Sequence, residues 1–343
     1  MIRSATLGAP PDTELADATL RQLQFALLGL GVYAIASAID YRVWHSLHRV
    51  LYLLAGGLLI VALAGGGSEI GDVRRWLNVA LFNIQPAELA KVLLIPAFAG
   101  HLAAQKQRER IGSLRSFIST LLLIALPTLA IFIQPNLSTA VVIVVIGMSM
   151  FYVAGLKIRH IITLIVIAAV ALPLVWSQMY DYQRERIAQF IDPSSNRDTE
   201  YNLIQAEISI GSGGLLGQGY TQGSQNQGHY LKVRHTDFIF SVIGEELGFI
   251  GALIVLALIT ILLLRLLRVA QLAQDEYSRL LAVGVFAMIF FQMTVNVAMN
   301  LRLGPVAGLP LPLVSYGGSS LVTMLLALGL VQSALMRHKK IEF

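Results

Sequence analysis

Long blocks of apolar residues alternate with polar connections along this chain. A helix that crosses a lipid bilayer needs about 20 largely apolar residues, and nine blocks reach that length. The pattern therefore predicts an all-α polytopic membrane protein with nine transmembrane helices. Their centres lie near Leu30, Ala55, Ile95, Leu126, Val145, Val166, Leu256, Ile289 and Leu326.

One polar connection, residues 177–236, is much longer than the others and is rich in Gly, Ser, Gln and charged residues. Ordered loops of such length are usually functional. We expect a single transmembrane domain over residues 1–343, with 177–236 as a large loop outside the membrane. After this loop a helix is expected to run from Asp237 to about Arg268, with Gly244, Gly248 and Gly251 as points where it can bend.

Composition agrees with a membrane protein and excludes several classes of chemistry. The 343 residues are 56% hydrophobic and 13% charged, with a mean hydropathy of +0.69, whereas a soluble chain carries about 25% charged residues. The chain has no cysteine, which excludes disulfides, thiol catalysis and thiolate metal sites. The net charge of +5 gives no reason to expect a nucleic-acid partner.

Basic residues predict the orientation in the membrane. More than half of the 25 Lys and Arg fall in alternate short connections, which the positive-inside rule places in the cytoplasm together with the C-terminus. With nine helices the N-terminus would then lie outside, and no signal peptide is visible in Met1–Leu7. We therefore expect that most of an earlier helix is missing from the start of this chain.

The third apolar block holds two opposite charges. Glu88 and Lys91 are three residues apart in QPAELAK and share one helix face, and Pro86 suits the helix start. Ionisable residues within a membrane helix are functional candidates by default, but a structural clasp between helices is an equally good interpretation. In the outer loop before this helix, Arg75 stands beside Arg74 and Trp76.

The long loop holds two further candidates. Gln183 and Arg186 are spaced for one helix face, although such a charged run is more often only a solvated surface. The five glycines between Gly211 and Gly219 could present backbone N–H groups to a phosphate, but they match no nucleotide-binding motif.

Asp237 lies where the long polar loop meets the next apolar block. An acid at a membrane surface, with Arg75, Lys91 and Arg186 on the same predicted outer side, suits an anionic lipid headgroup such as a lipid diphosphate. The seven histidines show no zinc-binding spacing. His235 is more typical of a hydrogen-bonding neighbour of Asp237 than of a metal ligand.

At these residues the sequence resembles the SEDS family of peptidoglycan glycosyltransferases (shape, elongation, division and sporulation), and the resemblance covers nearly the whole chain. The residues in its motifs are closer to those of the elongation member than to those of the cell-division paralogue. The motifs are RRWLNVALFNIQPAELAK (74–91), QPNLST (134–139), the glycine run at 210–219, RHTDFIFSVIGEELG (234–248) and GLPLPLVSYGGSS (308–320).

The resemblance implies that the protein polymerises lipid II into glycan strands at the outer face of the cytoplasmic membrane. It implies that Asp237 is the catalytic general base, and that a class B penicillin-binding protein is the partner that supplies transpeptidation. Ser315 and Tyr316 would shape the lipid or sugar cavity, although a helix-start turn is equally allowed. The expected substrate-binding residues are Arg75, Glu88, Lys91, Gln183, Arg186, His235, Ser315 and Tyr316.

Two departures from the family pattern limit which family features and residue roles can be transferred to this chain. The family usually has ten spans, and Met1–Leu7 resembles the end of its first helix. The family's QPDLGT is QPNLST here, with Asn136 where Asp is usual, so no metal-ligand or proton role for that acid is transferred. A divalent cation, magnesium or manganese, is allowed but its ligands are unknown.

Two other classes of function stay open at this stage. Pro96, Pro127 and Pro173 within apolar blocks could mark the broken helices of a transporter that flips lipid II, or only ordinary kinks. A noncatalytic scaffold for cell-wall assembly is the third interpretation.

Overall fold

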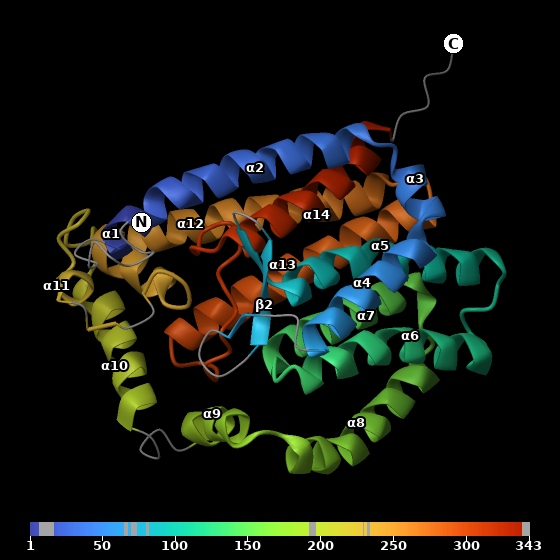
Figure 1. The fold of residues 1–343 in the computed structure, drawn as a ribbon, viewed down its shortest axis with the longest axis horizontal. Coiled ribbons are helices and arrows are strands. Elements are labelled where there is room, and N and C mark those ends of the chain that lie inside the picture. The colour runs from blue at the N-terminus through green and yellow to red at the C-terminus, as the bar shows by residue number, and fades with distance from the viewer. Residues whose placement is uncertain are drawn as a thin grey trace. The chain divides into compact units, whose positions relative to one another are not determined.

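The computed structural model describes residues 1–6, 17–64, 68–69, 74–79, 82–191, 197–228, 230–231 and 234–337. Helices make up nearly all of this part of the chain, as predicted (Figure 1). They are α1 (Ile2–Thr6), α2 (Ala18–Ala38), α3 (Tyr41–Ser46), α4 (His48–Leu63), α5 (Pro86–Gln107), α6 (Leu114–Ile133), α7 (Leu137–Gly155), α8 (Ile158–Gln178), α9 (Asp181–Ile191), α10 (Arg197–Ser212), α11 (Ser224–Gln227), α12 (Ile239–Leu272), α13 (Glu276–Asn300) and α14 (Gly318–Met336).

Each of the nine predicted apolar blocks is helical. Among the described residues, eight helices are long and apolar enough to cross a membrane: α2, α5, α6, α7, α8, α12, α13 and α14. The ninth, α4, is apolar but has only 16 residues. The prediction of a polytopic, largely α-helical membrane protein is confirmed.

The chain divides into two compact units, which are described separately. The first unit comprises Met1–Leu28, Asp181–Leu264 and Phe290–Leu321, and the second comprises Gly29–Tyr180, Arg265–Ile289 and Val322–Phe343. Because the boundaries fall within α2, α12, α13 and α14, these four helices contribute residues to both units.

Helix α5 forms the centre of the second unit. It begins at Pro86, as predicted, and most of its side chains are buried. It packs against α4, α6 and α7, which run beside it in Figure 1. Gly100 allows the close contact with α4, because a Cβ there would lie 2.5 Å from the Cβ of His48. Small residues at such crossings are typical of packed membrane helices.

The outer loop that was expected before α5 contains three short strands, which the sequence did not predict. They are β1 (Ser68–Glu69), β2 (Arg74–Val79) and β3 (Phe82–Ile84), paired in the order β1-β2-β3, and both pairings are antiparallel. Strand β2 contacts α4 and α5. The pairing therefore holds the chain that leads into Pro86 as a small sheet.

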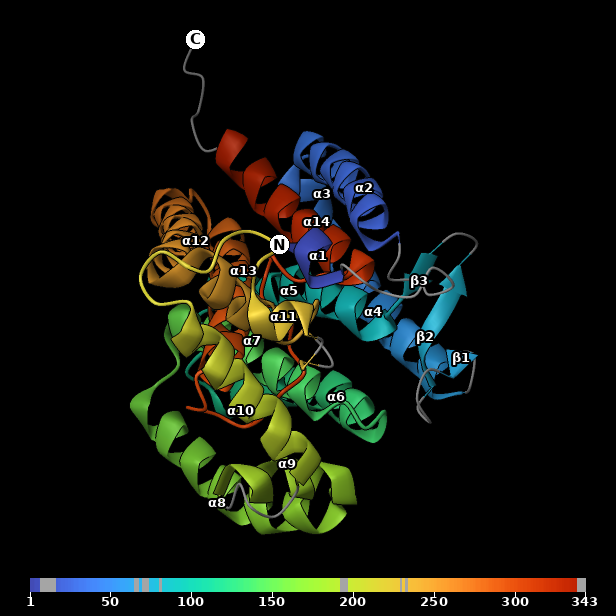
Figure 2. The ribbon, with the colours of Figure 1, turned by 90° about the vertical axis from the view of Figure 1, so that its left-hand side faces the viewer.

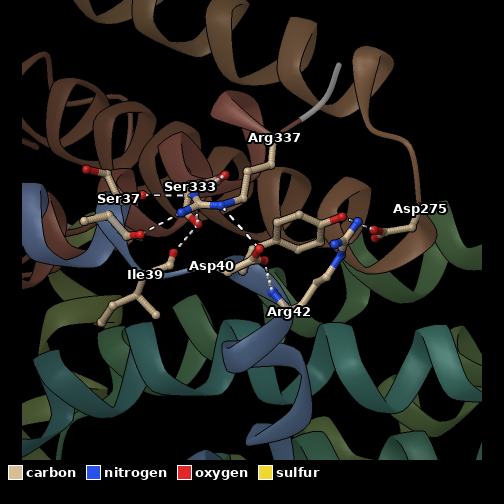
Figure 3. Close-up of polar contacts among 9 residues, drawn as sticks. Ser37, Ile39, Asp40, Arg42, Asp275, Ser333 and Arg337 are labelled. Carbon is tan, nitrogen blue, oxygen red and sulfur yellow. Dashed lines mark hydrogen bonds and ion pairs between the residues drawn. The ribbon is translucent and has the colours of Figure 1, made fainter. Parts of the chain in front are cut away.

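The end of α14 is tied to the end of α2 within the second unit (Figure 3). Arg337 donates hydrogen bonds to the main-chain carbonyls of Ser37 (3.2 Å) and Ala38 (2.6 Å). Its Nε also lies 3.4 Å from Oδ2 of Asp40. A cation that bonds the last carbonyls of a helix stabilises its C-terminus, so Arg337 caps α2 from a distant part of the sequence.

In the first unit, α12 is kinked at Gly248, which has a φ of +67°. The N–H groups of Phe249 and Ile250 bond to the carbonyls of Gly214 (2.9 Å) and Leu215 (3.2 Å) instead of continuing the helix. The prediction that α12 can bend at Gly248 is therefore confirmed, and the glycine-rich chain after α10 supplies the partners.

Candidate functional site

The candidate catalytic acid lies in a turn that leads into α12. Residues 234–238 form this turn, which we call the Asp237 turn, and helix α12 begins at Ile239. Phe238 is buried in an apolar cluster with Leu203, Ala206 and Leu231. Burial of this one aromatic side chain against α10 anchors the turn beside Asp237.

The chain before α14 holds the Asp237 turn from another side. Ser315 Oγ donates to the carbonyl of Thr236 (2.7 Å) and accepts from the N–H of Leu311 (2.8 Å). The N–H of Tyr316 donates to the carbonyl of His235 (3.0 Å), and the His235 and Tyr316 rings meet edge to face at 5.8 Å. The structure thus brings together four predicted site residues: His235, Asp237, Ser315 and Tyr316.

Ser315 is buried, and both hydrogen bonds of its hydroxyl go to the main chain. Of the two interpretations left open for Ser315 and Tyr316, these contacts favour the turn that precedes α14. A contact of either side chain with lipid or sugar stays a prediction.

The basic residues of the turn are partly withdrawn from solvent. Arg234 is buried, and its Nε donates to the carbonyl of Ala5 (2.5 Å). Burial lowers the pKa of Arg234. Burial, and then the charge of Arg234, also lower the pKa of His235. His235 is therefore neutral near pH 7, and its imidazole can accept as well as donate a hydrogen bond.

Two buried amides on α13 also reach the Asp237 turn, and the sequence analysis missed them. Asn296 and Asn300 each donate a hydrogen bond from Nδ2 to the carbonyl of Asp237, at 3.1 Å and 3.0 Å. The available signal was the recurrence of amides every four residues, at Gln292, Asn296 and Asn300, in an apolar helix.

Glu88 and Lys91 form the ion pair that their spacing predicts, in the second unit. Lys91 Nζ lies 2.7 Å from Glu88 Oε1, and the two side chains are only 1% and 7% exposed. Within the described part of the chain the ammonium has no other hydrogen-bond partner. The pair sits in the first two turns of α5, and its role in substrate binding stays a prediction.

Three other predicted residues are located by their backbone alone. Arg75 lies in strand β2 of the second unit. Gln183 and Arg186 lie in α9 of the first unit, so the expected helix around them is present. Their side chains fall outside the described parts of the structure, and their roles stay predictions.

Asn136, where the family pattern has Asp, caps a helix. Its Oδ1 accepts the N–H of Thr139 at 3.2 Å at the start of α7. The preceding Gln134 donates to the carbonyl of Leu59 at 2.8 Å. The motif therefore caps α7 and links its start to α4.

The N–H groups at the C-terminal end of the glycine run are already bonded to main-chain carbonyls. The N–H groups of Gly217, Gln218 and Gly219 donate to the carbonyls of Gly213, Glu245 and Glu246, at 2.8, 2.9 and 3.1 Å. A Cβ on Gly217 would lie 2.2 Å from the Glu246 carbonyl oxygen. The glycines therefore allow this close approach to α12, and a phosphate-binding role is not favoured.

Two carboxylates that the sequence analysis did not single out fix the chain after the glycine run. Glu245 accepts the main-chain N–H groups of Gln225 (2.6 Å) and Asn226 (3.1 Å) at the start of α11. Glu246 accepts from Asn226 Nδ2 (2.7 Å) and from the hydroxyl of Ser4. Ser4 belongs to α1, which lies beside α11 in Figure 2.

Across the described residues, no group of three or more His, Cys, Asp or Glu side chains could hold a metal ion. The divalent cation expected from the sequence therefore stays a prediction, with its ligands unknown.

Comparisons with known proteins agree with the motifs. A family described as "Cell cycle protein" (FtsW/RodA/SpoVE) matches residues 6–340. The peptidoglycan glycosyltransferase MrdB of Escherichia coli K12 is 36% identical over 325 residues, which cover 93% of this chain and 86% of that protein. A probable peptidoglycan glycosyltransferase FtsW of Geobacter sulfurreducens is 37% identical over 325 residues, with 93% and 85% covered.

Solved structures give the same result. A chain of a peptidoglycan synthase complex, solved to show how polymerization and crosslinking are coordinated, matches with a TM-score of 0.81 and 30% identity, covering 98% of this chain and 94% of that one. The crystal structure of the rod shape determining protein RodA of Thermus thermophilus matches with a TM-score of 0.71 and 29% identity, covering 99% and 92%. The resemblance seen in the sequence is confirmed: this chain belongs to the FtsW/RodA/SpoVE (SEDS) family.

Proposed function

We propose that this protein is a peptidoglycan glycosyltransferase that polymerises lipid II into glycan strands during cell elongation. The observation that carries the proposal is the Asp237 turn, which two separate segments, α13 and the chain before α14, hold by hydrogen bonds to its main chain. Relatives that share 36–37% of its residues are named peptidoglycan glycosyltransferases, and that name supports the reaction.

In the proposed reaction, Asp237 takes the proton from the 4-hydroxyl of the acceptor sugar. The hydroxyl oxygen forms a bond to the donor's anomeric carbon while the bond from that carbon to the diphosphate breaks, which inverts the centre. General-base assistance of this kind contributes typically about 10²- to 10⁴-fold. Because the leaving group is already a diphosphate, the reaction needs no second carboxyl group as an acid.

The leaving diphosphate requires positive charge. We assign this role to Lys91, Arg75 and Arg186, with Glu88 orienting Lys91 through the 2.7 Å ion pair. Preorganised cations stabilise charge that develops in the transition state. Magnesium or manganese would enter with the diphosphate, because such ions usually bind through one or two carboxylates and substrate phosphates, but no step above depends on it.

The proposal includes a location and a partner. The protein is a multi-pass membrane protein, and we place it in the cytoplasmic membrane with its C-terminus in the cytoplasm, from the distribution of Lys and Arg. The proposed partner is a class B penicillin-binding protein. A structural neighbour from a complex that coordinates polymerization and crosslinking supports that choice.

The decisive experiment uses the full-length protein with purified lipid II and separates the products on a gel. Wild type should give glycan strands and Asp237→Asn should give none, because an amide cannot take the proton. Glu207→Gln is the control, since Glu207 is an exposed acid that pairs with Arg302 on the surface, at 3.1 Å. Polymer from Asp237→Asn, or none from wild type, would overturn the proposal.

A lipid II flippase is the rival from another class. Pro96, Pro127 and Pro173 each lie inside a continuous helix, in α5, α6 and α8. Continuous helices do not match the broken helices at a transporter's binding site. A translocation assay alongside the polymerisation assay separates the two, because a flippase moves lipid II without lengthening it.

The cell-division role of the same family is the second candidate, because a relative named FtsW is as similar as MrdB. Complementation decides between them. The chain should restore rod shape to cells depleted of their elongation polymerase and should not restore division to cells depleted of the division polymerase.

A further inference from the structure

Three side-chain amides lie along one face of α13, at a spacing of four residues. Gln292, Asn296 and Asn300 are 0%, 1% and 0% exposed. A buried amide without hydrogen bonds is destabilising. Asn296 and Asn300 both have hydrogen bonds, and their partners indicate what these two residues do.

Asn296 and Asn300 converge on one atom, the main-chain carbonyl oxygen of Asp237. Their Nδ2 atoms lie 3.1 Å and 3.0 Å from it. Asn296 also donates to the carbonyl of Leu309 (2.8 Å) and so ties the same point to the chain before α14. The position of Asp237 is thereby fixed through its backbone.

Asn300 also accepts hydrogen bonds. Its Oδ1 accepts the N–H (3.2 Å) and the hydroxyl (2.6 Å) of Ser241. In a regular α-helix the N–H of residue 241 would bond to the carbonyl of residue 237. That bond is replaced by the carboxamide of Asn300, whose Oδ1 accepts from the Ser241 N–H and whose Nδ2 donates to the Asp237 carbonyl. The Ser241 N–H also reaches the Phe238 carbonyl at 3.0 Å.

This insertion explains why α12 begins at Ile239 and why Asp237 stays in a turn. If the bond between residues 237 and 241 formed, the helix would extend over Asp237. Because successive residues in a helix turn by about 100°, its carboxylate would then leave its present direction.

We infer that Asn296 and Asn300 are positioning residues for Asp237: their side-chain amides prevent α12 from extending and hold the acid in the turn from which it acts. The inference rests on the proposed function, since it assumes that Asp237 is the base. The two asparagines do not touch substrate in this scheme and act only through the backbone of Asp237.

The test measures kcat and KM of the full-length protein with lipid II, together with its thermal unfolding midpoint. Asn300→Asp keeps the acceptor for Ser241 and nearly the same shape, but replaces the donor to Asp237. Gln292→Leu is the matched control, because Gln292 lies on the same face, is equally buried, and its amide has no hydrogen-bond partner among the described residues.

We expect Asn300→Asp and Asn296→Asp each to lower kcat by about 10²-fold, the effect of misplacing a reacting group by roughly 1 Å, with KM unchanged. Gln292→Leu should keep the wild-type kcat. If Asn300→Asp does not fold, Asn296→Asp carries the test, because it removes the same kind of donor and leaves Ser241 paired.

Either of two results would overturn the inference: folded aspartate variants with wild-type kcat, or a Gln292→Leu variant that loses as much kcat as they do. Both are distinct from failure of the proposed function, in which wild type makes no polymer or Asp237→Asn still makes it.

Discussion

Two regions hold their carboxylates in opposite ways. In the second unit, Glu88 and Lys91 are buried and hold each other by charge, with 2.7 Å between nitrogen and oxygen. In the first unit, the amides of Asn296 and Asn300 and the hydroxyl of Ser315 hold the Asp237 turn through main-chain carbonyls. One region is fixed by its charged side chains and the other by its backbone.

The two kinds of support respond differently when a side chain is changed. A buried ion pair depends on both charges, because removing one leaves the other without compensation in a medium of low polarity. A turn fixed through its carbonyls keeps its shape when a side chain on it changes. An acid that must change protonation state during a reaction is better placed on the second kind of support.

The largest effect should come from breaking the ion pair. Lys91→Met leaves the carboxylate of Glu88 buried and unpaired, and we expect it to lower the free energy of unfolding by about 3–5 kcal/mol. The double variant Glu88→Leu/Lys91→Met should recover most of that loss. Chemical denaturation in detergent measures both; a single variant that is as stable as the double variant would show that the charges do not depend on each other.

The polymerisation assay extends this test to function. If Lys91 stabilises the leaving diphosphate as proposed, the double variant should be stable and inactive. A stable and active double variant would show that Glu88 and Lys91 have only a structural role, the other interpretation that their spacing allowed.

Removing one main-chain support of the Asp237 turn should have a smaller effect. Ser315→Ala removes the hydrogen bonds to the carbonyl of Thr236 and from the N–H of Leu311, so each of these main-chain groups loses one partner. Such a loss costs about 1–3 kcal/mol. Thermal unfolding measures the loss against wild type. An unfolding midpoint of Ser315→Ala equal to that of wild type would contradict the role given to Ser315.

A cap on α7 should contribute less again. Asn136→Ala removes the acceptor for the Thr139 N–H and should cost about 1 kcal/mol, the typical value for an N-cap. Asn136→Asp, which restores the residue usual in the family, should keep the stability, because Asp and Asn cap a helix about equally well. If Asn136→Asp also leaves polymerisation unchanged, capping accounts for this position.

The sequence predicted elements whose signal is local. The apolar blocks correspond to helices because hydrophobic length alone decides which segments cross a bilayer. The Glu88–Lys91 pair follows from a spacing of three on one helix. The bend at Gly248 follows from the residue that best tolerates a positive φ.

Other features depend on contacts between distant residues, which one sequence does not reveal. The strands β1–β3 are short, and nothing in residues 65–85 shows a clear alternation. Asn300 reaches Asp237 across 63 positions, and Arg337 reaches Ala38 across 299. The amides of α13 could have been noticed as polar residues at helical spacing, but their target could not.

The pH dependence of stability tests the turn without altering its main-chain bonds. The pKa of His235 is lowered in the folded protein by burial and by Arg234, whereas the unfolded chain should titrate near about 6.5. Above that pH both states are neutral; below it the unfolded state binds the proton first, so folding loses stability as the pH falls. Thermal unfolding between pH 7.5 and pH 5.5 should show a smaller decrease in His235→Gln than in wild type.

The smallest change in stability should come from the residue with the largest effect on activity. Asp237→Asn leaves every hydrogen bond to the Asp237 carbonyl in place, and Asn suits the residues before a helix as well as Asp does. We expect the free energy of unfolding to change by no more than about 0.5 kcal/mol, because Asn keeps the shape of Asp and the main-chain bonds of the turn are retained. A loss as large as that of Lys91→Met would mean that the carboxylate itself holds the turn. If stability is kept and polymer is lost, the backbone of this turn carries the fold and its side chain is left for the reaction.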